Sequence, residues 1–557
     1  MRSGVESVGV AAAIAFTLGI GATPAAAATC ASLANLTLPD TTVTAAQPIP
    51  AGTYTAPNGA VFTNMPAFCR VAATLTPTSD SNIKIEVWMP SAGWTGRYLG
   101  TGNGGIGGNI VYGWLLALQG NNAVANTDLG TSPAATDPLG GIVLTGHPEK
   151  QIDYATRSTH LMTVRAKQII EAFYGERPRY SYFFGCSTGG TQGVHEALQF
   201  PGDYDGIIAQ APGMAGTRYG AAEIWDYGAF NRSPVNITAA QVSAINAAIV
   251  KKCVGRDGGL SSDNFLTDPR DCVWDPATLQ CTGTPADAPT CLTAPQVAAM
   301  RKFYQGPINP RTGQRIYAGR PLGSEVNQFG PVGIEAASRP NTTGPYWVFG
   351  TDFDWRTYDF DRDVDTVDEA LAARSNANTA DLEQFQSHGG KLILWHGFAD
   401  ARIPPLNTVA YYERLIAGQT PGNGHGKGER KAGLHRTQEF ARLFLAPGVG
   451  HCNGGAGPDT ADLLSPLVQW VEQDVAPEQI ISSKIVNGVT TFTRPLCPYP
   501  ALPRYSGVGD TTKASSFACV ADSDNDDNHP PAPKYLDDRH NYPIVPIDGD
   551  PGDDDKR

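Results

Sequence analysis

Strands and helices alternate along two separate stretches of the chain, and this alternation limits the fold more than any other feature. In the first stretch, β-type runs alternate with segments whose apolar residues have helical spacing: Ile83–Met89, Tyr98–Gly100, Arg157–Tyr174, Arg179–Phe184 and Gln192–Phe200. In the second, the pattern continues through Lys391–Trp395, Asn407–Ala417, Arg442–Ala446 and Asp459–Gln473. Such alternation predicts a parallel α/β sheet covered by helices.

The two stretches are separated by about 165 residues of a different character. Between about Arg218 and Gln384 the chain holds four cysteines, many aromatic residues and short helical pieces such as Ala239–Val250. We interpret this segment as a lid domain inserted into the α/β domain. The sequence therefore predicts a catalytic domain formed by residues 29–217 and 386–520, and a lid formed by residues 218–385.

The N-terminus has the features of a secretory signal peptide. Arg2 precedes an apolar run, Val8–Ile20, and the alanines after Pro24 offer cleavage sites, so we expect residues 1–28 to be removed. The run of about 13 residues is shorter than the roughly 20 that a transmembrane helix needs. We therefore expect a secreted protein, extracellular or periplasmic, without stable membrane association.

Ten cysteines fit an oxidising compartment, because an even number in an exported chain favours disulfides. Sequence neighbours suggest four pairs: Cys30–Cys69, Cys253–Cys272, Cys281–Cys291 and Cys497–Cys519. Cys186 and Cys452 lie far apart in the sequence, and their spacing alone does not pair them.

The chain is acidic, with 54 acidic and 41 basic residues and a net charge of −13. Nucleic acids and anionic membranes bind basic surfaces, so neither is an expected partner. Residues 521–557 contain 11 acidic and 4 basic residues, and we expect them to form a poorly ordered tail. The oligomeric state is not indicated.

One short motif indicates the chemistry of the chain. Gly185-Cys186-Ser187-Thr188-Gly189 matches G-x-S-x-G, and it stands between a predicted strand and a predicted helix. This context is that of the nucleophile in α/β-hydrolases, where a sharp turn exposes the serine hydroxyl. We therefore predict that Ser187 is a nucleophile, which then requires a histidine base and an acid that orients the histidine.

The acid and the base are expected after later strands, in the order serine, acid, histidine. Asp400 follows the strand Lys391–Trp395, and His451 follows the strand Arg442–Ala446 in a Gly-rich loop. The competing histidine His396 is close to Asp400 in sequence but precedes it. We predict the triad Ser187, Asp400 and His451.

The oxyanion formed by such a nucleophile needs backbone N–H donors. The fold predicts the N–H of Thr188 and a second one from the Gly-rich loop Gly102–Gly105, from Gly104 or Gly105. The alternative for this loop is an ordinary turn. No Lys-Ser or Lys-Thr follows it, which argues against a phosphate-binding loop.

The chain resembles the tannase and feruloyl esterase family over about residues 45–500. The resemblance rests on the Cys-Ser, Asp, His-Cys signature formed by Cys186-Ser187, Asp400 and His451-Cys452, and on further matches: Trp94–Tyr98, Gly102–Gly105, Gly146–Lys150, Tyr204–Ile207 and Gly389–Leu392. It implies an α/β-hydrolase fold and a Cys186–Cys452 disulfide beside the triad. Contact between Ser187 and His451 also requires these two cysteines to lie close together.

The resemblance implies a carboxylic-ester hydrolase that acts on esters of aromatic acids, such as hydroxycinnamates or gallates, and needs no cofactor for catalysis. Mono(2-hydroxyethyl) terephthalate hydrolases belong to the same family, so terephthalate monoesters are the alternative substrates. An inactive protein that binds ligands through its lid is an alternative of another class. The intact triad motifs argue against it.

The resemblance also implies a structural Ca²⁺ site in the lid, between Cys253 and Cys272. Its expected ligands are the carboxylates of Asp257 and Asp263 and the carbonyls of Gly259 and Phe265. Val254 stands where the family has an acidic ligand, and Ca²⁺ needs about 6–8 oxygens, so the site is weakened or lost.

Aromatic residues are frequent in the lid, where they either cover an aromatic acyl group or form the core of the lid. We select Trp347 and Phe349 as candidates for contact with the substrate. Arg339 or Arg356 is the candidate to face a carboxylate on the substrate.

Overall fold

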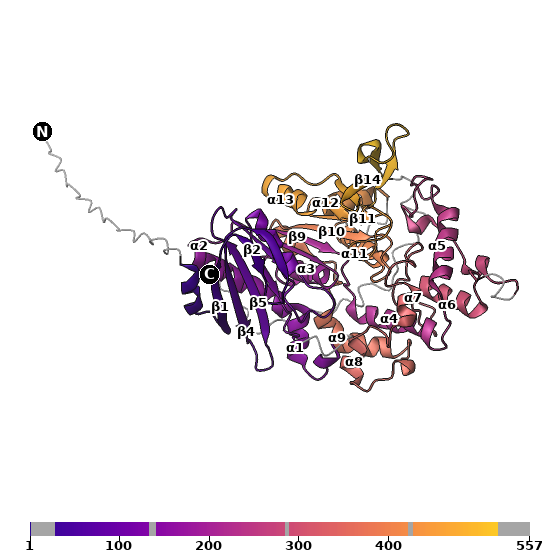
Figure 1. Ribbon diagram of the computed structural model, residues 1–557, viewed down its shortest axis with the longest axis horizontal. Helices are drawn as coiled ribbons and strands as arrows, with labels where there is room; N and C mark the ends of the chain where they lie inside the picture. The colour runs from indigo at the N-terminus through magenta and orange to yellow at the C-terminus, as the bar shows by residue number, and fades with distance from the viewer. Residues whose placement is uncertain (2–27, 133–140, 284–288, 421–426, 522–557) are drawn as a thin grey trace.

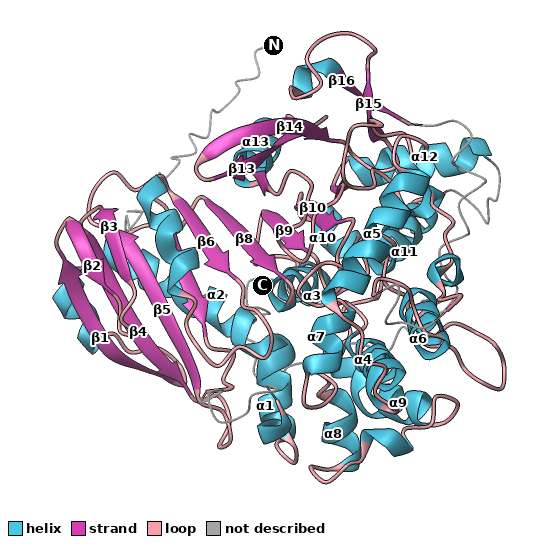
Figure 2. Ribbon diagram, turned by 45° about the vertical axis from the view of Figure 1, so that its right-hand side comes forward, coloured by secondary structure: helices cyan, strands magenta, loops and turns pink. Residues whose placement is uncertain are grey.

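The computed structural model describes residues 1, 28–132, 141–283, 289–420 and 427–521. The predicted signal peptide and acidic tail lie almost entirely outside these residues. A sheet of nine strands, in the order β1-β4-β5-β7-β6-β8-β9-β10-β11, forms the centre of the molecule (Figure 2). The strands are β1 (Thr41–Ile49), β4 (Phe68–Leu75), β5 (Ile83–Pro90), β6 (Arg97–Thr101), β7 (Ala123–Thr127), β8 (Tyr180–Cys186), β9 (Gly206–Gln210), β10 (Lys391–Gly397) and β11 (Ala441–Ala446).

Six neighbouring strands of this sheet run parallel, as the alternation of strands and helices predicts: β7, β6, β8, β9, β10 and β11. β1, β4 and β5 extend the sheet on one side through antiparallel pairs. The carboxyl ends of β8, β10 and β11 therefore lie along one edge, where the loops after them meet.

Successive residues of the parallel strands enter two different hydrophobic cores, because side chains alternate between the two faces of a sheet. Ile207 and Leu394 point into the core that α2 (Ser158–Tyr174), α3 (Thr188–Gln199) and α11 (Pro405–Gly418) cover. Ile208 and Trp395 point into the opposite core, against α13 (Leu464–Gln473). α12 (Lys427–Gln438) packs beside β11.

The last predicted helix begins five residues later than expected. Thr460–Ala461 forms the short strand β12 instead of the first helical turn. The carboxylate of Asp462 accepts hydrogen bonds from the N–H groups of Leu464 and Ser465, at 3.1 and 3.0 Å. These are helix-capping contacts, so α13 starts only after Asp462.

The segment between β9 and β10 is predominantly helical. Its helices gather on the side of the molecule away from β1 and β4 (Figures 1 and 2). They are α4 (Gly216–Asn231), α5 (Ala239–Cys253), α6 (Ala294–Gln305), α7 (Pro331–Ala336), α8 (Gly344–Phe349), α9 (Asp363–Ser375) and α10 (Glu383–Ser387). This segment is called the lid below, and its status as a separate domain remains a prediction.

The remaining α-helix and strands lie outside the central sheet. They are α1 (Pro148–Ile152), β2 (Gly52–Thr55), β3 (Val61–Met65), β13 (Ile480–Val486), β14 (Val489–Leu496), β15 (Leu502–Tyr505) and β16 (Phe517–Val520). Among the described residues, none of the helices has the length and apolar character needed to span a bilayer.

Candidate active site

Ser187 occupies the sharp turn between β8 and α3. Its φ of 63° and ψ of −122° are a strained conformation for a residue with a side chain, and such strain is concentrated at functional sites. Gly185 permits the turn, since a Cβ atom there would lie 2.5 Å from the carbonyl of Gly189. The strand–turn–helix context expected for a nucleophile is therefore present.

Asp400 and His451 lie on the loops that follow β10 and β11. These loops pack tightly, because a Cβ atom on Gly397 would lie 2.2 Å from the carbonyl oxygen of Gly450. The structure brings both residues to Ser187, although 264 positions separate Ser187 and His451 in the sequence.

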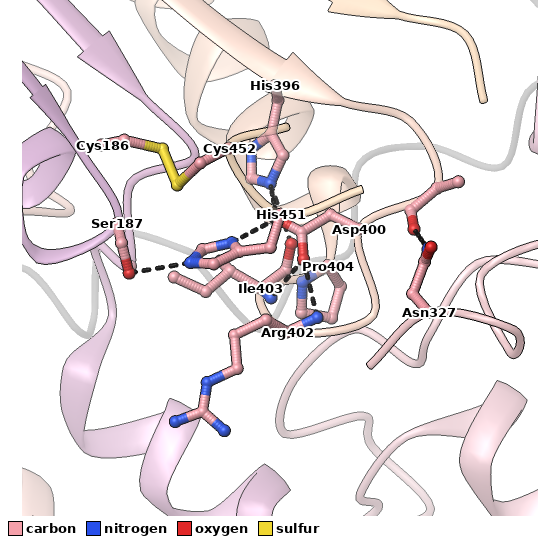
Figure 3. A network of polar contacts seen from close by, with 12 residues as sticks. Cys186, Ser187, Asn327, His396, Asp400, Arg402, Ile403, Pro404, His451 and Cys452 are labelled. Carbon is pink, nitrogen blue, oxygen red and sulfur yellow. Dashed lines mark hydrogen bonds and ion pairs between the residues drawn. A yellow bond between two sulfur atoms is a disulfide. The ribbon is translucent and has the colours of Figure 1, made fainter. Parts of the chain in front are cut away.

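Two hydrogen bonds connect the three side chains (Figure 3). Nε2 of His451 is 2.9 Å from the hydroxyl oxygen of Ser187, and Nδ1 is 2.8 Å from Oδ2 of Asp400. A carboxylate can only accept, so Nδ1 donates its proton to Asp400 and Nε2 accepts the proton of the Ser187 hydroxyl. A serine in this arrangement can transfer its proton to the imidazole as it attacks a carbonyl carbon.

Asp400 is fully buried and all its acceptor positions are used. Oδ1 accepts hydrogen bonds from the N–H groups of Arg402 and Ile403, at 2.7 and 3.0 Å, and Oδ2 contacts both His451 and His396. Burial alone would raise the pKa of Asp400. The charge of His451 and the hydrogen bonds from both histidines outweigh burial and hold this pKa well below its usual range.

The expected oxyanion donors stand beside the nucleophile. Thr188 begins α3, so its N–H has no acceptor within the helix. Its hydroxyl donates to the carbonyl of Gly105 at 2.5 Å, and the N–H of Gly189 donates to the carbonyl of Asn103 at 2.7 Å. These bonds join the Gly-rich loop to the turn, and Gly104 and Gly105 line the same cavity as Ser187.

The cysteines that flank the two catalytic candidates form a disulfide. Cys186 and Cys452 are joined across 266 positions, with their Cα atoms 6.0 Å apart (Figure 3). The other pairs in the structure are Cys30–Cys69, Cys253–Cys272, Cys281–Cys291 and Cys497–Cys519. These are the five pairs expected from the sequence and the resemblance.

Ser187 opens into a cavity of about 750 Å³ between the sheet and the lid. Trp347 lines it, as expected, and its indole N–H donates to the carbonyl of Gly141. Phe349 and Arg339 are not among the described residues that line it, which corrects two of the predicted substrate contacts. Aromatic side chains in the lining are Trp114, Tyr154, Tyr219, Phe329 and Trp347.

Helix geometry explains why Trp347 lines the cavity and Phe349 does not. Residues two positions apart in a helix do not share a face, so Trp347 and Phe349 point in different directions from α8. Phe349 packs against Phe353, with ring centroids 5.2 Å apart, at the margin of a hydrophobic core of the lid. Arg339 lies over the ring of Tyr346, and the exposed Arg356 pairs with Asp354. Neither arginine is among the described residues that line the cavity, where a substrate carboxylate was expected.

Three polar residues of the site were not singled out from the sequence. Asn327, from the lid, donates to the carbonyl of Ala399 beside Asp400 at 2.5 Å (Figure 3). Arg402 and Asn341 line the cavity. Only Arg402 carried a sequence signal, since it follows Asp400 by two positions.

The lid loop between Cys253 and Cys272 does not fit Ca²⁺. Asp257 accepts hydrogen bonds from the N–H groups of Gly255, Gly259 and Thr267, so its two oxygens already have protein donors. Asp263 pairs at 2.9 Å with Arg494, whose side chain is only 6% exposed. A guanidinium therefore neutralises the carboxylate that a metal ion would need.

His160, Glu196 and Asp203 are another group whose ligand-type atoms lie within 4.8 Å of one another. Nδ1 of His160 is 2.7 Å from Oδ2 of Asp203. Burial and the charge of Asp203 raise the pKa of Glu196 well above its usual range, which disfavours its carboxylate form. His160 and Asp203 are hydrogen-bonded to each other, and a metal ion needs the carboxylate form that burial disfavours at Glu196, so we assign no metal to the group.

The mostly parallel sheet, the turn at Ser187 and the loops after β10 and β11 define an α/β-hydrolase. A profile of the family described as "Tannase and feruloyl esterase" matches residues 69–520. The chain belongs to this family, and it is a carboxylic-ester hydrolase. The fold and family expected from the sequence are confirmed.

Individual relatives agree with this assignment. The chain is 38% identical to an uncharacterized esterase of Xanthomonas campestris pv. campestris, over 89% of this chain and 92% of that protein. It is 31% identical to the mono(2-hydroxyethyl) terephthalate hydrolase of Piscinibacter sakaiensis, over 84% and 87%. The crystal structure of feruloyl esterase B from Aspergillus oryzae superposes with a TM-score of 0.79 at 26% identity, covering 88% of this chain and 99% of that one.

Proposed function

We propose that this protein is an exported serine esterase that hydrolyses esters of aromatic acids through an acyl-enzyme. The observation that carries the proposal is the hydrogen-bonded series Ser187, His451 and Asp400 at the edge of a large cavity. Nucleophile, base and orienting acid are each within hydrogen-bond distance of the next, which is the arrangement that activates a serine.

The reaction follows from these contacts. The oxygen of Ser187 attacks the ester carbonyl while Nε2 of His451 takes the hydroxyl proton. The N–H groups of Thr188 and of Gly104 or Gly105 stabilise the oxyanion. The C–O bond then breaks, and the alcohol leaves with the proton from His451. Water, deprotonated by the same histidine, attacks the acyl-enzyme and releases the acid.

The cavity favours an aromatic acyl group. Its rings from both the sheet side and the lid offer flat apolar surfaces, which suit stacking and edge-to-face contacts. Feruloyl and galloyl esters are the proposed substrates, and terephthalate monoesters are the alternative. The hydrogen-bonded contacts of Ser187, His451 and Asp400 argue against an inactive binding protein.

Export is proposed on two grounds: the signal-peptide features of residues 1–28, and the presence of five disulfides, which persist in oxidising compartments. N-terminal sequencing of protein collected outside the cytoplasm tests it. A mature chain that starts near Ala28 or Thr29 supports export, and an intact Met1 in the recovered protein contradicts it.

The test of function is hydrolysis of methyl ferulate, methyl gallate, mono(2-hydroxyethyl) terephthalate and p-nitrophenyl butyrate by purified protein. We expect aromatic acids to be preferred about 100-fold in kcat/KM, and Ser187→Ala to lower kcat by about 10⁴-fold or more with an unchanged melting temperature. Ser465→Ala, on an exposed turn of α13, is the matched control. Undiminished turnover in Ser187→Ala would refute the mechanism, and hydrolysis of p-nitrophenyl butyrate alone would refute the substrate class.

A further inference from the structure

The cavity beside Ser187 has one permanently charged side chain among the described residues that line it. Its lining contains no Asp, Glu or Lys, and its cation is Arg402. The Arg402 side chain is 20% exposed. Figure 3 shows its guanidinium extending away from Asp400, below the Ser187–His451 pair in that view.

The guanidinium is held in place but keeps donors for a ligand. Nη1 lies 3.3 Å from Oε2 of Glu223. We assign the side-chain oxygen of Asn341 to the position facing the guanidinium, because only this orientation satisfies both amide atoms, and the oxygen then accepts from Nη2 and Nη1 at 2.5 and 3.2 Å. The rings of Phe329 and Tyr219 lie 5.0 and 5.6 Å from its carbon. Within the described part of the chain, these contacts use three of its five N–H donors.

The carboxylate that contacts Arg402 is divided between two guanidiniums. Glu223 is shared with Arg320, at 2.8 Å, and Arg320 also pairs with Asp226 at 2.7 Å. Burial raises the pKa of Asp226 to about 7. Arg320 is not among the described residues that line the cavity, so Arg402 is the member of this group that reaches it.

We propose that Arg402 forms an anion-binding subsite and that the preferred substrates are aromatic esters bearing a carboxylate, an inference that rests on the proposed esterase function. A guanidinium binds a carboxylate through two parallel N–H···O bonds. The ring of Phe329 contacts both His451, at 5.8 Å, and Arg402. The guanidinium and the base of the proposed triad therefore lie next to the same ring.

The carboxylate can belong to either half of the ester. Mono(2-hydroxyethyl) terephthalate carries its carboxylate on the acyl side of the ester, and chlorogenate carries it on the alcohol side. The test compares each compound with its carboxamide, which has nearly the same shape and no charge. We expect wild-type protein to prefer the carboxylate in one of the two pairs, and this pair identifies which half of the ester carries the charge.

Arg402→Gln is expected to reduce that preference about 10- to 100-fold in kcat/KM, the scale of a hydrogen bond between charged groups. Arg402→Lys should restore part of it. Glu223 keeps Arg320 as its partner in both variants, and melting temperatures check the fold. Arg301→Gln removes the same charge from the exposed surface of α6 and should leave the preference unchanged.

Binding of the same four compounds to Ser187→Ala protein, measured by calorimetry, makes the test independent of turnover. Equal affinity for carboxylate and carboxamide in both pairs would overturn the subsite, as would a preference that survives Arg402→Gln. Tight, Arg402-dependent binding of the carboxylate compounds without hydrolysis by wild-type protein would instead overturn the proposed esterase function and keep the subsite.

Discussion

His396 donates a hydrogen bond to Asp400, because its Nε2 atom lies 3.1 Å from the oxygen Oδ2 that also contacts His451. Both side chains are fully buried. Nε2 also lies 2.8 Å from the carbonyl oxygen of Ile403, which can only accept, so this nitrogen carries a proton. The hydroxyl of Thr408 lies 2.8 Å from Nδ1. His396 is therefore a positioning residue for the acid of the proposed triad.

Replacement of His396 should change the pH dependence of the enzyme. In His396→Leu, Asp400 loses a donor and its carboxylate interacts more strongly with the imidazolium of His451. We expect kcat/KM to fall about 10-fold and the acidic limb of its pH profile to move to higher pH. His396→Gln, which retains an N–H near the position of Nε2, should largely restore both. An unchanged pH profile of kcat/KM in His396→Leu would show that His396 has only a packing role.

Loss of the Cys186–Cys452 disulfide should lower activity before it unfolds the protein. The bond closes a loop of 266 positions and joins the neighbours of Ser187 and His451. We expect Cys186→Ala/Cys452→Ala to lose about 5 kcal/mol of unfolding free energy and at least about 10-fold in kcat where it is still folded.

The matched control is Cys281→Ala/Cys291→Ala, which opens a loop of 10 positions in the lid. It should lose about 3 kcal/mol and keep full activity. Unfolding in urea and turnover at a temperature well below both melting points separate the two effects. Full activity of the folded Cys186→Ala/Cys452→Ala protein would contradict a role in positioning the triad.

The parallel sheet and the three loops of the proposed triad were predictable because their signals are local. The strand before Ser187 and the strands before Asp400 and His451 are short apolar runs, and parallel strands bring the loops after them to one edge. The start of α13 was also encoded locally: Asp462 precedes an apolar run, and an acidic residue in that position is a capping signal.

Other features depend on contacts that no local pattern contains. The acidic loop after Cys253 resembles a cation site, yet its Asp263 pairs with Arg494, which lies 231 positions later. Composition likewise could not show that Trp347 lines the cavity while Phe349, two positions later, does not. Long-range pairing and side-chain direction are set by the tertiary fold, so they required the structure.

Calcium should not stabilise this protein. A site with a Kd of about 1 μM would gain about 4 kcal/mol at about 1 mM Ca²⁺, which raises a melting temperature by several degrees. Because Arg494 already neutralises Asp263, we expect the same melting temperature with Ca²⁺ and with EDTA. A rise of several degrees on addition of Ca²⁺ would contradict this account of the loop.

Arg494 should instead supply the stability of that loop. Arg494→Met leaves the carboxylate of Asp263 buried without a partner, and we expect a loss of about 3 kcal/mol in urea unfolding. Arg311→Met is the control, since Arg311 forms an ion pair with Asp361 but is 71% exposed, and its loss should be much smaller. Equal losses of unfolding free energy in the two variants would contradict a stabilising role of Arg494 in the loop.

Asp128 should make the protein less stable as the pH rises. Its Oδ1 accepts from the N–H groups of Lys84 and Gly130, both at 2.8 Å, while Oδ2 is buried without a hydrogen-bond partner among the described residues. Burial raises the pKa of Asp128 to about 6. The folded state then binds a proton that the unfolded state has already released, so the unfolding free energy falls by about 3 kcal/mol from about pH 4 to above pH 6.

Asp128→Asn keeps the Oδ1 acceptor and cannot titrate, so its difference in stability from wild type should change by this amount over the same range. Urea unfolding across the range measures it, with the exposed Asp474→Asn as control, and a difference that stays constant with pH would exclude the buried carboxyl group as the cause.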